Sequence, residues 1–227
     1  MSSTLKVGLM VPANNTTMEH ELLTWLPAGS TCTTARIPRG KGMLTADTLP
    51  EYKAQALALA RQFATPAIDV LAYGCTAAGF ISGPAGDAAL QSELGVVSGK
   101  PVVTTARSMV LALQEIGAKE IALVTPYLDD VNARLKAFLN DGGIRVRRFA
   151  SFYAQNVDEL GRIEAGAVAR LARETVDDAC DALFIACSQL PTAAILEGLG
   201  RELGRPALSS IQATAHFVAR THERVAA

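Results

Sequence analysis

The sequence predicts an α/β protein made of two duplicated parallel-sheet domains, and two observations favour this fold class. Short runs rich in Val, Ile, Leu and Ala alternate along the 227 residues with stretches of helical periodicity, which is typical of βαβ units. The two halves also repeat each other: Asp-x-Leu-x-x-x-Cys-Thr at residues 69–76 returns as Asp-x-Leu-x-x-x-Cys-Ser at residues 181–188. The cysteines of the two copies are 187 − 75 = 112 residues apart.

Two further matches extend this repeat in the same order along the chain. Residues 99–105 (GKPVVTT) correspond to residues 204–210 (GRPALSS), with an offset of 105. Residues 9–12 (LMVP) correspond more loosely to residues 123–126 (LVTP), with an offset of 114. Three ordered matches with similar offsets indicate a duplicated α/β unit.

Eight strands are expected, each a short β-rich run bounded by turn residues. Helical spacing is clear between them at residues 49–63, where Leu57, Ala60 and Ala64 recur on one face, and at residues 130–139. The predicted strands are residues 5–11, 31–37, 68–74, 101–105, 120–125, 144–152, 182–186 and 206–210.

The turn at Gly117 sets the predicted domain boundary. We expect an N-terminal domain at residues 1–116 and a C-terminal domain at residues 117–227, related by a pseudo-twofold axis, with the final helix able to pack on the N-terminal domain. Ligands of open parallel sheets bind outside the carboxyl ends of the strands. The active site is therefore predicted in the cleft between the domains, at strand ends 12–17, 75–76, 126–129 and 187–188.

Charge and hydropathy exclude several classes of partner. Lys and Arg (21) nearly cancel Asp and Glu (22), so the chain has no basic field that would attract nucleic acid or anionic lipid. No apolar run is long enough to span a membrane, and the first residues lack the parts of a secretory signal. We expect a cytoplasmic homo-oligomer that acts on a small molecule.

The four cysteines, Cys32, Cys75, Cys180 and Cys187, form no C-x-x-C pair and have no accompanying histidine cluster, so no metal site is expected. Cys32 and Cys180 are expected to pack as small buried residues. Cys75 and Cys187 each precede a predicted helix start, where backbone N–H groups lower a thiol pKa. We interpret them as a functional pair, and the alternative is two further core cysteines.

Nucleotide-binding and nucleophile-elbow motifs are absent from the sequence. It contains no G-x-G-x-x-G before a helix, no Walker motif and no G-x-S-x-G. Any chemistry is therefore expected to use no cofactor and to depend on the thiols.

Polar residues at the strand ends are candidates for binding a carboxylate. PANNTTME at residues 12–19 has the pattern of a helix start, and Asn15 and Thr16 could also donate to an anion there. Thr76 and Ser188, next to the two cysteines, are similar capping or anion-binding residues.

Two other segments have an ordinary structural interpretation beside a functional one. Tyr127 would point a phenol toward the cleft from a strand-to-helix turn, and Asn156 is typical of a helix cap. Arg36, Arg39 and Lys41 form a basic loop, which is either a solvated surface or an aid to an anionic substrate.

Five segments, VPANNTTME, YGCTAAGF, TPYLDDVNARLKAFL, QNVDELGRI and ACSQLPT, resemble the aspartate/glutamate racemase superfamily. Within it they resemble the branch of maleate cis–trans isomerases and arylmalonate decarboxylases, over essentially the whole chain. The resemblance implies a cofactor-independent isomerase of a small dicarboxylate. It implies Cys75 as nucleophile and Cys187 as the partner that handles the proton, with Asn15, Tyr127 and Asn156 binding substrate.

Three other functions are compatible with the same residues. One is a racemase of the aspartate or glutamate type, although the Asp-Ser-Gly first loop usual in those enzymes is absent. Another is an arylmalonate-type decarboxylase, although those that we compare have only the second cysteine. The third is a non-catalytic protein that binds a small acid and whose cysteines are structural.

Overall fold

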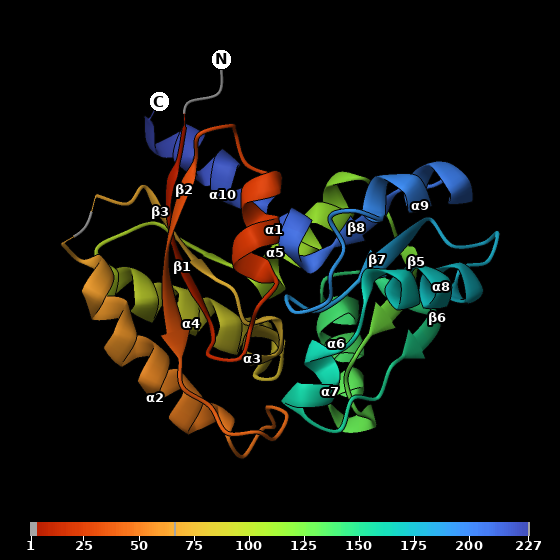
Figure 1. Ribbon diagram of the computed structural model, residues 1–227, viewed down its shortest axis with the longest axis horizontal. Coiled ribbons are helices and arrows are strands. Elements are labelled where there is room, and N and C mark those ends of the chain that lie inside the picture. Colours follow the sequence, from red (N-terminus) through yellow and green to blue (C-terminus); the bar gives the residue numbers. More distant parts are fainter. Residues whose placement is uncertain (1–3, 66, 227) are drawn as a thin grey trace.

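The computed structural model describes residues 4–65 and 67–226, which form two lobes, each around a four-stranded parallel sheet (Figure 1). Every strand pair is parallel, as the near-continuous apolar runs predict. The predicted α/β class with two parallel sheets is confirmed. The first sheet has the order β2-β1-β3-β4, from β1 (Lys6–Pro12), β2 (Thr31–Ile37), β3 (Val70–Tyr73) and β4 (Val102–Thr104); the second has the order β6-β5-β7-β8, from β5 (Glu120–Thr125), β6 (Arg145–Ser151), β7 (Ala182–Ile185) and β8 (Ala207–Ser209).

The strands of the two sheets correspond at the offsets found in the sequence. The first residues of β1 and β5 differ by 120 − 6 = 114, and those of β2 and β6 differ by 145 − 31 = 114. The offset is 182 − 70 = 112 for β3 and β7, and 207 − 102 = 105 for β4 and β8. Both sheets thus have the same strand order and nearly the same spacing, as expected of a duplicated unit.

Helices connect the strands and cover both faces of the sheets. The expected helix at residues 49–63 divides into α2 and a single 3₁₀ turn, η1 (Arg61–Phe63). The prediction that a helix starts directly after Cys187 was wrong. Residues 188–195 form turns, and the next helix begins at Leu196. The helices are α1 (Met18–Thr24), α2 (Leu49–Ala60), α3 (Thr76–Phe80), α4 (Gly83–Ser98), α5 (Thr105–Glu115), α6 (Asp129–Asp141), α7 (Val157–Gly161), α8 (Ala165–Thr175), α9 (Leu196–Leu203) and α10 (Ser210–Ala226).

The last helix, α10, packs on the first sheet although it follows the last strand of the second (Figure 1). Ile211, Ala215 and Val218 of α10 belong to the same buried cluster as Val7 and Leu9 of β1. One face of the first sheet is therefore covered by a helix from the other end of the chain.

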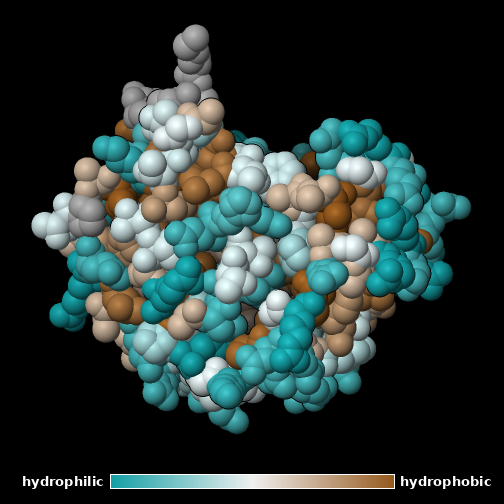
Figure 2. Space-filling view, in the orientation of Figure 1, coloured by the Kyte–Doolittle hydropathy of each residue, from teal (hydrophilic) through white to brown (hydrophobic). Residues whose placement is uncertain are grey.

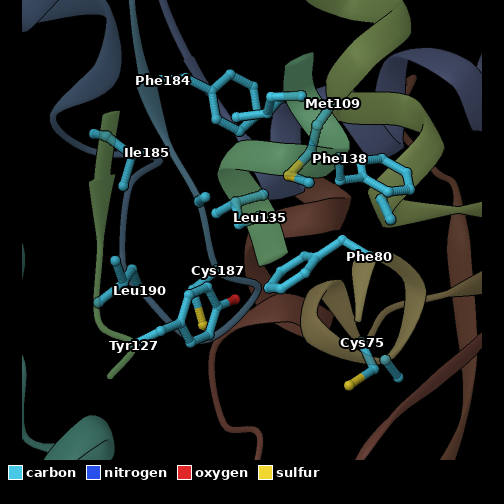
Figure 3. Packing of buried hydrophobic residues seen from close by; sticks show 14 of the residues in the cluster. Cys75, Phe80, Met109, Tyr127, Leu135, Phe138, Phe184, Ile185, Cys187 and Leu190 are labelled. Carbon is cyan, nitrogen blue, oxygen red and sulfur yellow. The ribbon is translucent and has the colours of Figure 1, made fainter. Parts of the chain in front are cut away.

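A second apolar cluster runs through both lobes and holds them together. Met109 of α5, Phe138 of α6 and Phe184 of β7 all belong to it (Figure 3). The α5 helix also reaches the second lobe through Gln114 Nε2, which donates to the Gly142 carbonyl at 2.8 Å. A shared core of this kind fixes the relative position of the two sheets and so of their strand ends.

Among the described residues, no helix is both long and apolar enough to cross a bilayer. Figure 2 shows hydrophilic and hydrophobic residues interspersed over the face in view, without one continuous apolar surface.

Candidate active site

Two of the four cysteines lie at the carboxyl ends of equivalent strands. Cys75 follows the end of β3 by 75 − 73 = 2 residues, and Cys187 follows the end of β7 by 187 − 185 = 2 residues. Both line one small cleft between the lobes, with a cavity volume of about 40 Å³. The other lining residues are Pro12, Asn14, Asn15, Arg39, Met43, Leu44, Thr76, Ala77, Tyr127, Leu128, Val131, Leu160, Ser188 and Gln189.

The remaining cysteines do not line this cleft. Cys32 is the second residue of β2 and is partly buried, and burial raises the pKa of its thiol to about 12. Cys180 is buried in the turn before β7, where its Sγ lies 3.2 Å from a carboxylate oxygen of Asp177. The position of Cys180 fits the packing role predicted for it, and that of Cys32 fits it in part.

A glycine before Cys75 lets the strand end come close to the first helix. A Cβ on Gly74 would lie 2.5 Å from Met18 Sδ and 3.0 Å from the Met10 carbonyl oxygen. The first distance is shorter than a Cβ contact and the second is tight, so a larger residue would force Met18 or the strand end to move. The close approach brings Cys75 next to the polar residues that precede α1.

Cys75 is the residue that precedes α3, and only 4% of it is exposed. Burial raises the pKa of its thiol; the Tyr52 hydroxyl, the backbone N–H groups of Ala78 and Ala77, and Arg39 act in the opposite direction. The prediction of a lowered pKa for Cys75 was wrong, because the effect of burial is larger than that of the backbone donors. Tyr52 has a strongly raised pKa, mainly through burial, so its hydroxyl stays protonated beside the sulfur.

Cys187 is in a similar setting, with 6% of it exposed. Burial raises the pKa of its thiol, and a charge on Cys75 raises it further; the Gln189 amide and the Tyr127 hydroxyl lower it. The backbone amide of Gln189 donates to Cys187 Sγ at 3.4 Å. The donor that was expected from a helix start therefore comes from a turn. Because a negative charge on one sulfur opposes a charge on the other, the pair does not carry two thiolates at once.

Tyr127 is held against Cys187 by an aromatic contact. Its ring lies beside the thiol in Figure 3, and the Phe80 ring meets it edge-on with 5.6 Å between centroids. Its hydroxyl is buried and has no partner with hydrogen-bond geometry. Burial raises its pKa well above the usual value, so it remains a donor. The structure thus places predicted residue Tyr127 in the cleft, with an uncommitted phenol.

Asn15, Thr76 and Ser188 join the two halves of the site by hydrogen bonds. Asn15 Nδ2 donates to the Ser188 carbonyl at 3.0 Å and to its Oγ at 3.2 Å. The Ser188 amide donates to Thr76 Oγ1 at 3.1 Å. Asn15 Oδ1 accepts from the Met18 amide at 2.9 Å, which orients the side chain. These three predicted residues form a buried polar cradle next to the cysteines.

Thr16 contacts the opposite lobe but does not line the cleft. Its amide donates to Gln189 Oε1 and its Oγ1 accepts from Gln189 Nε2, both at 3.0 Å. The side chain is exposed, and its polar groups are used in this contact. Gln189, which we did not single out from the sequence, lines the cleft; its signal was its place in ACSQLPT, two residues after Cys187.

Asn156 is also outside the residues that line the cleft. It caps α7, because its Oδ1 accepts from the amides of Asp158 at 3.1 Å and Glu159 at 3.0 Å. Its backbone forms a β-bridge with Gly42, which ties the loop after β2 to the second lobe. Helix capping accounts for these hydrogen bonds of the Asn156 side chain. Its role in substrate binding remains a prediction.

Of the basic residues Arg36 in β2 and Arg39 and Lys41 in the loop after it, the structure brings only Arg39 to the cleft. Arg36 is exposed and pairs with Glu19 at 3.0 Å, and Lys41 is exposed. A metal is not favoured by the donor set, since the described residues contain no group of three or more His, Cys, Asp or Glu that could hold one.

The thiol pKa values make alkylation a test of the site. Because burial raises the pKa of both Cys75 and Cys187, the rate of labelling by iodoacetamide should keep rising with pH beyond the ~8.5 of a free thiol. Peptide mapping after timed labelling between pH 6 and about 10 measures this for each cysteine. A rate for Cys75 that levels off below neutral pH would contradict the structure.

Comparison with known proteins decides the kinship. A family model for arylmalonate decarboxylase matches residues 7–226. The chain belongs to the arylmalonate decarboxylase family. The kinship predicted from the five sequence segments, with the branch of maleate cis–trans isomerases and arylmalonate decarboxylases, is confirmed.

Relatives in the arylmalonate decarboxylase family include enzymes of two activities. The chain is 25% identical to the maleate isomerase of Geobacillus stearothermophilus, over 97% of this chain and 93% of that protein. It is 30% identical to the arylmalonate decarboxylase of Bordetella bronchiseptica, over 60% of this chain and 57% of that protein. Of these two relatives, the isomerase matches over nearly its whole length and the decarboxylase over somewhat more than half.

A solved structure from the same group superposes closely. The maleate cis–trans isomerase of Nocardia farcinica, as a cysteine-to-serine variant with a covalently bound succinylcysteine intermediate, has a TM-score of 0.89 and 26% identity. The match covers 97% of this chain and 94% of that one. The two-lobed fold of the family is thus shared along the whole chain.

Proposed function

We propose that the protein is a cofactor-independent cis–trans isomerase of a small dicarboxylate of the maleate type. The observation that carries the proposal is the pair of buried cysteines at equivalent strand ends of one cleft, beside a polar cradle. Support comes from the full-length similarity to maleate isomerases. The succinylcysteine in the Nocardia farcinica enzyme supports a cysteine that adds to the alkene.

The reaction assigns a separate task to each thiol. The Cys75 thiolate attacks one alkene carbon; a C–S bond forms, and the π electrons move to the other carbon, where the adjoining carboxylate delocalises them. Cys187 donates its proton to that carbon, which leaves a succinyl group on Cys75 and a thiolate on Cys187. The bond between the two carbons is now single and rotates.

Elimination then reverses these steps in the rotated adduct. The Cys187 thiolate removes a proton from the carbon next to the C–S carbon, the alkene re-forms, and the C–S bond breaks. The trans acid leaves, with Cys75 as thiolate and Cys187 as thiol, so atoms and charge balance over the cycle. The hydroxyls of Tyr52 and Tyr127 donate to the sulfur beside each of them whenever that sulfur is charged.

Proton NMR of the protein with maleate, aspartate, glutamate and phenylmalonate in deuterated buffer tests the reaction type. We expect the alkene signal of maleate to be replaced by that of fumarate. Deuterium at the α-carbon of an amino acid would instead indicate the racemase, and loss of a carboxylate from phenylmalonate the decarboxylase. Turnover of none of the four would favour the non-catalytic binding protein and contradict the proposal.

The decarboxylase is the second candidate, since one wall of the cleft is apolar. Met43, Leu44, Leu128, Val131 and Leu160 line it, and such a surface suits an aryl group. The presence of Cys75, which the decarboxylation of a malonate does not need, favours the isomerase.

The remaining parts of the proposal concern partners and location. We infer that the small anionic substrate is the main ligand, and that neither nucleic acid nor a membrane is a partner, because the net charge is only −1. We also propose that the protein is a homo-oligomer and that it is located in the cytoplasm. Size-exclusion chromatography with light scattering measures the oligomeric state, and a monomer at all concentrations would contradict it.

Asn15 is proposed to bind a substrate carboxylate through Nδ2. Replacement by alanine is expected to weaken dicarboxylate binding by about 1–3 kcal/mol, as for a lost hydrogen bond to a charged group. It also removes the acceptor for the Met18 amide, with a cost of about 1 kcal/mol in the free energy of unfolding. Michaelis constants and urea unfolding measure the two effects separately.

The variant Asn15→Asp is the matched control for this prediction. Its carboxylate keeps an acceptor for the Met18 amide but has no donor for a ligand or for the Ser188 carbonyl. Substrate binding should therefore be lost, with some loss of stability from the buried charge that urea unfolding measures. Unchanged Michaelis constants in both variants would rule out the role of Asn15 in binding.

A further inference from the structure

The loop between β2 and α2, residues 38–48, forms a wall shared by two cavities. Arg39, Met43 and Leu44 line the cleft that contains the cysteines. The same three residues line an outer pocket, together with Tyr52 of α2. Arg39 therefore lies where the catalytic cleft meets the outer pocket.

The guanidinium of Arg39 is only partly satisfied within the protein. Its Nη2 donates to the Gly42 carbonyl at 2.6 Å, but its Nε is buried and has no hydrogen-bond partner. None of the ion pairs among the described residues includes Arg39. A buried cationic N–H group without an acceptor is costly, so this group is suited to an anionic ligand.

Neighbouring polar groups also favour an anionic ligand at this position. The Tyr52 hydroxyl is also buried, with only 3% of that residue exposed, and lies beside the Cys75 sulfur. Glu51 is the carboxylate that lines the outer pocket, and its Oε1 accepts from Gln55 Nε2 at 3.2 Å. Arg39 thus borders both cavities without a carboxylate partner among the described residues.

Arg39 is close enough to the reacting centre to influence it. Among the described residues that line the cleft, Arg39 alone carries a formal charge at neutral pH. Its charge lowers the pKa of the Cys75 thiol and of the Tyr52 phenol against the effect of burial. The cradle of Asn15, Thr76 and Ser188 is built from other elements and contains only uncharged donors.

We propose that Arg39 binds the second carboxylate of the substrate and so selects dicarboxylates over acids with one carboxylate. The uncharged cradle binds the first carboxylate beside the cysteines, and the guanidinium binds the other from the loop wall. This assignment rests on the proposed function for the identity of the site, but it concerns binding and is tested without turnover. Arg39 is thereby a specificity-determining residue.

Calorimetric titration with succinate and butyrate tests the proposal. Both ligands have four carbons and no alkene, and butyrate has a methyl group in place of one carboxylate. The wild-type protein is expected to bind succinate more tightly. Arg39→Gln is expected to weaken succinate binding about 10- to 100-fold and to change butyrate binding by less than about twofold. Arg39→Lys, which keeps the charge, is expected to retain part of the preference.

Lys41→Gln is the matched control, since it removes the same charge from an exposed position two residues away in the same loop. It is expected to leave both affinities unchanged. The proposal would be overturned if the wild-type protein bound succinate and butyrate equally well. It would also be overturned if Arg39→Gln left the ratio of the two affinities unchanged, or if Lys41→Gln weakened succinate binding as much as Arg39→Gln does. Failure of the isomerase assay with this preference intact would remove the proposed reaction and leave the assignment of Arg39 standing.

Discussion

Replacing Cys75 with serine is expected to abolish isomerisation, with a loss of at least about 10⁴-fold in turnover. The hydroxyl has nearly the size of the thiol but is far less acidic and far less nucleophilic toward an alkene. The buried position at the start of α3 accepts a hydroxyl, so the thermal unfolding temperature should change little. Fumarate formation from maleate, followed by NMR, measures the loss.

Cys32→Ser is the control for this substitution. Cys32 lies in β2 and outside the residues that line the cleft, so this variant should keep wild-type turnover. Full activity of Cys75→Ser would disprove the assignment of Cys75 as nucleophile. Equal loss in both variants would point to a general effect of removing a thiol from the first sheet.

Replacing Cys187 with serine is expected to lower turnover by about 10²- to 10⁴-fold, the usual contribution of a positioned proton donor. Addition of Cys75 to maleate remains possible, because the nucleophile and the cradle are intact. The succinyl adduct formed after slow protonation lacks the base needed for elimination and accumulates. Intact-mass spectrometry should show one added maleic acid per chain, and peptide mapping should place it on Cys75.

The double variant Cys75→Ser, Cys187→Ser controls for adducts elsewhere and should gain no mass. An adduct on Cys187 in the single variant Cys75→Ser would exchange the roles of the two thiols. The absence of any adduct in Cys187→Ser, together with normal turnover, would remove Cys187 from the mechanism.

The strands and their pairing followed from the sequence because strong local signals mark them. Each strand is a short apolar run that ends at a turn, and the offsets of 105 to 114 found in the sequence recur between equivalent strands. The cysteines at 75 and 187 were placed correctly at strand ends for the same reason. Periodicity and repetition therefore predict architecture well.

The rest of the site depends on contacts between distant segments, which one sequence does not contain. Arg39 reaches the cleft from an irregular loop with no periodicity, and Tyr52 of α2 lines the outer pocket next to it. The thiol pKa values were misjudged because local sequence reveals nearby N–H donors but not the burial created by residues such as Phe80 and Tyr127. The contacts of Asn156, in contrast, are local and could be predicted, since its side chain caps the helix that follows it.

The position of α10 has a consequence for synthesis on the ribosome. Met18 and Leu22 of α1 cover part of this face of the first sheet, and the cover is completed only when Ile211, Ala215 and Val218 have been made. At translation rates of about 5–20 residues per second, the ~100 residues after the first half take about 5–20 s. During that interval part of the core of the first lobe stays open to chaperones, and the lobe closes only after α10 has left the exit tunnel.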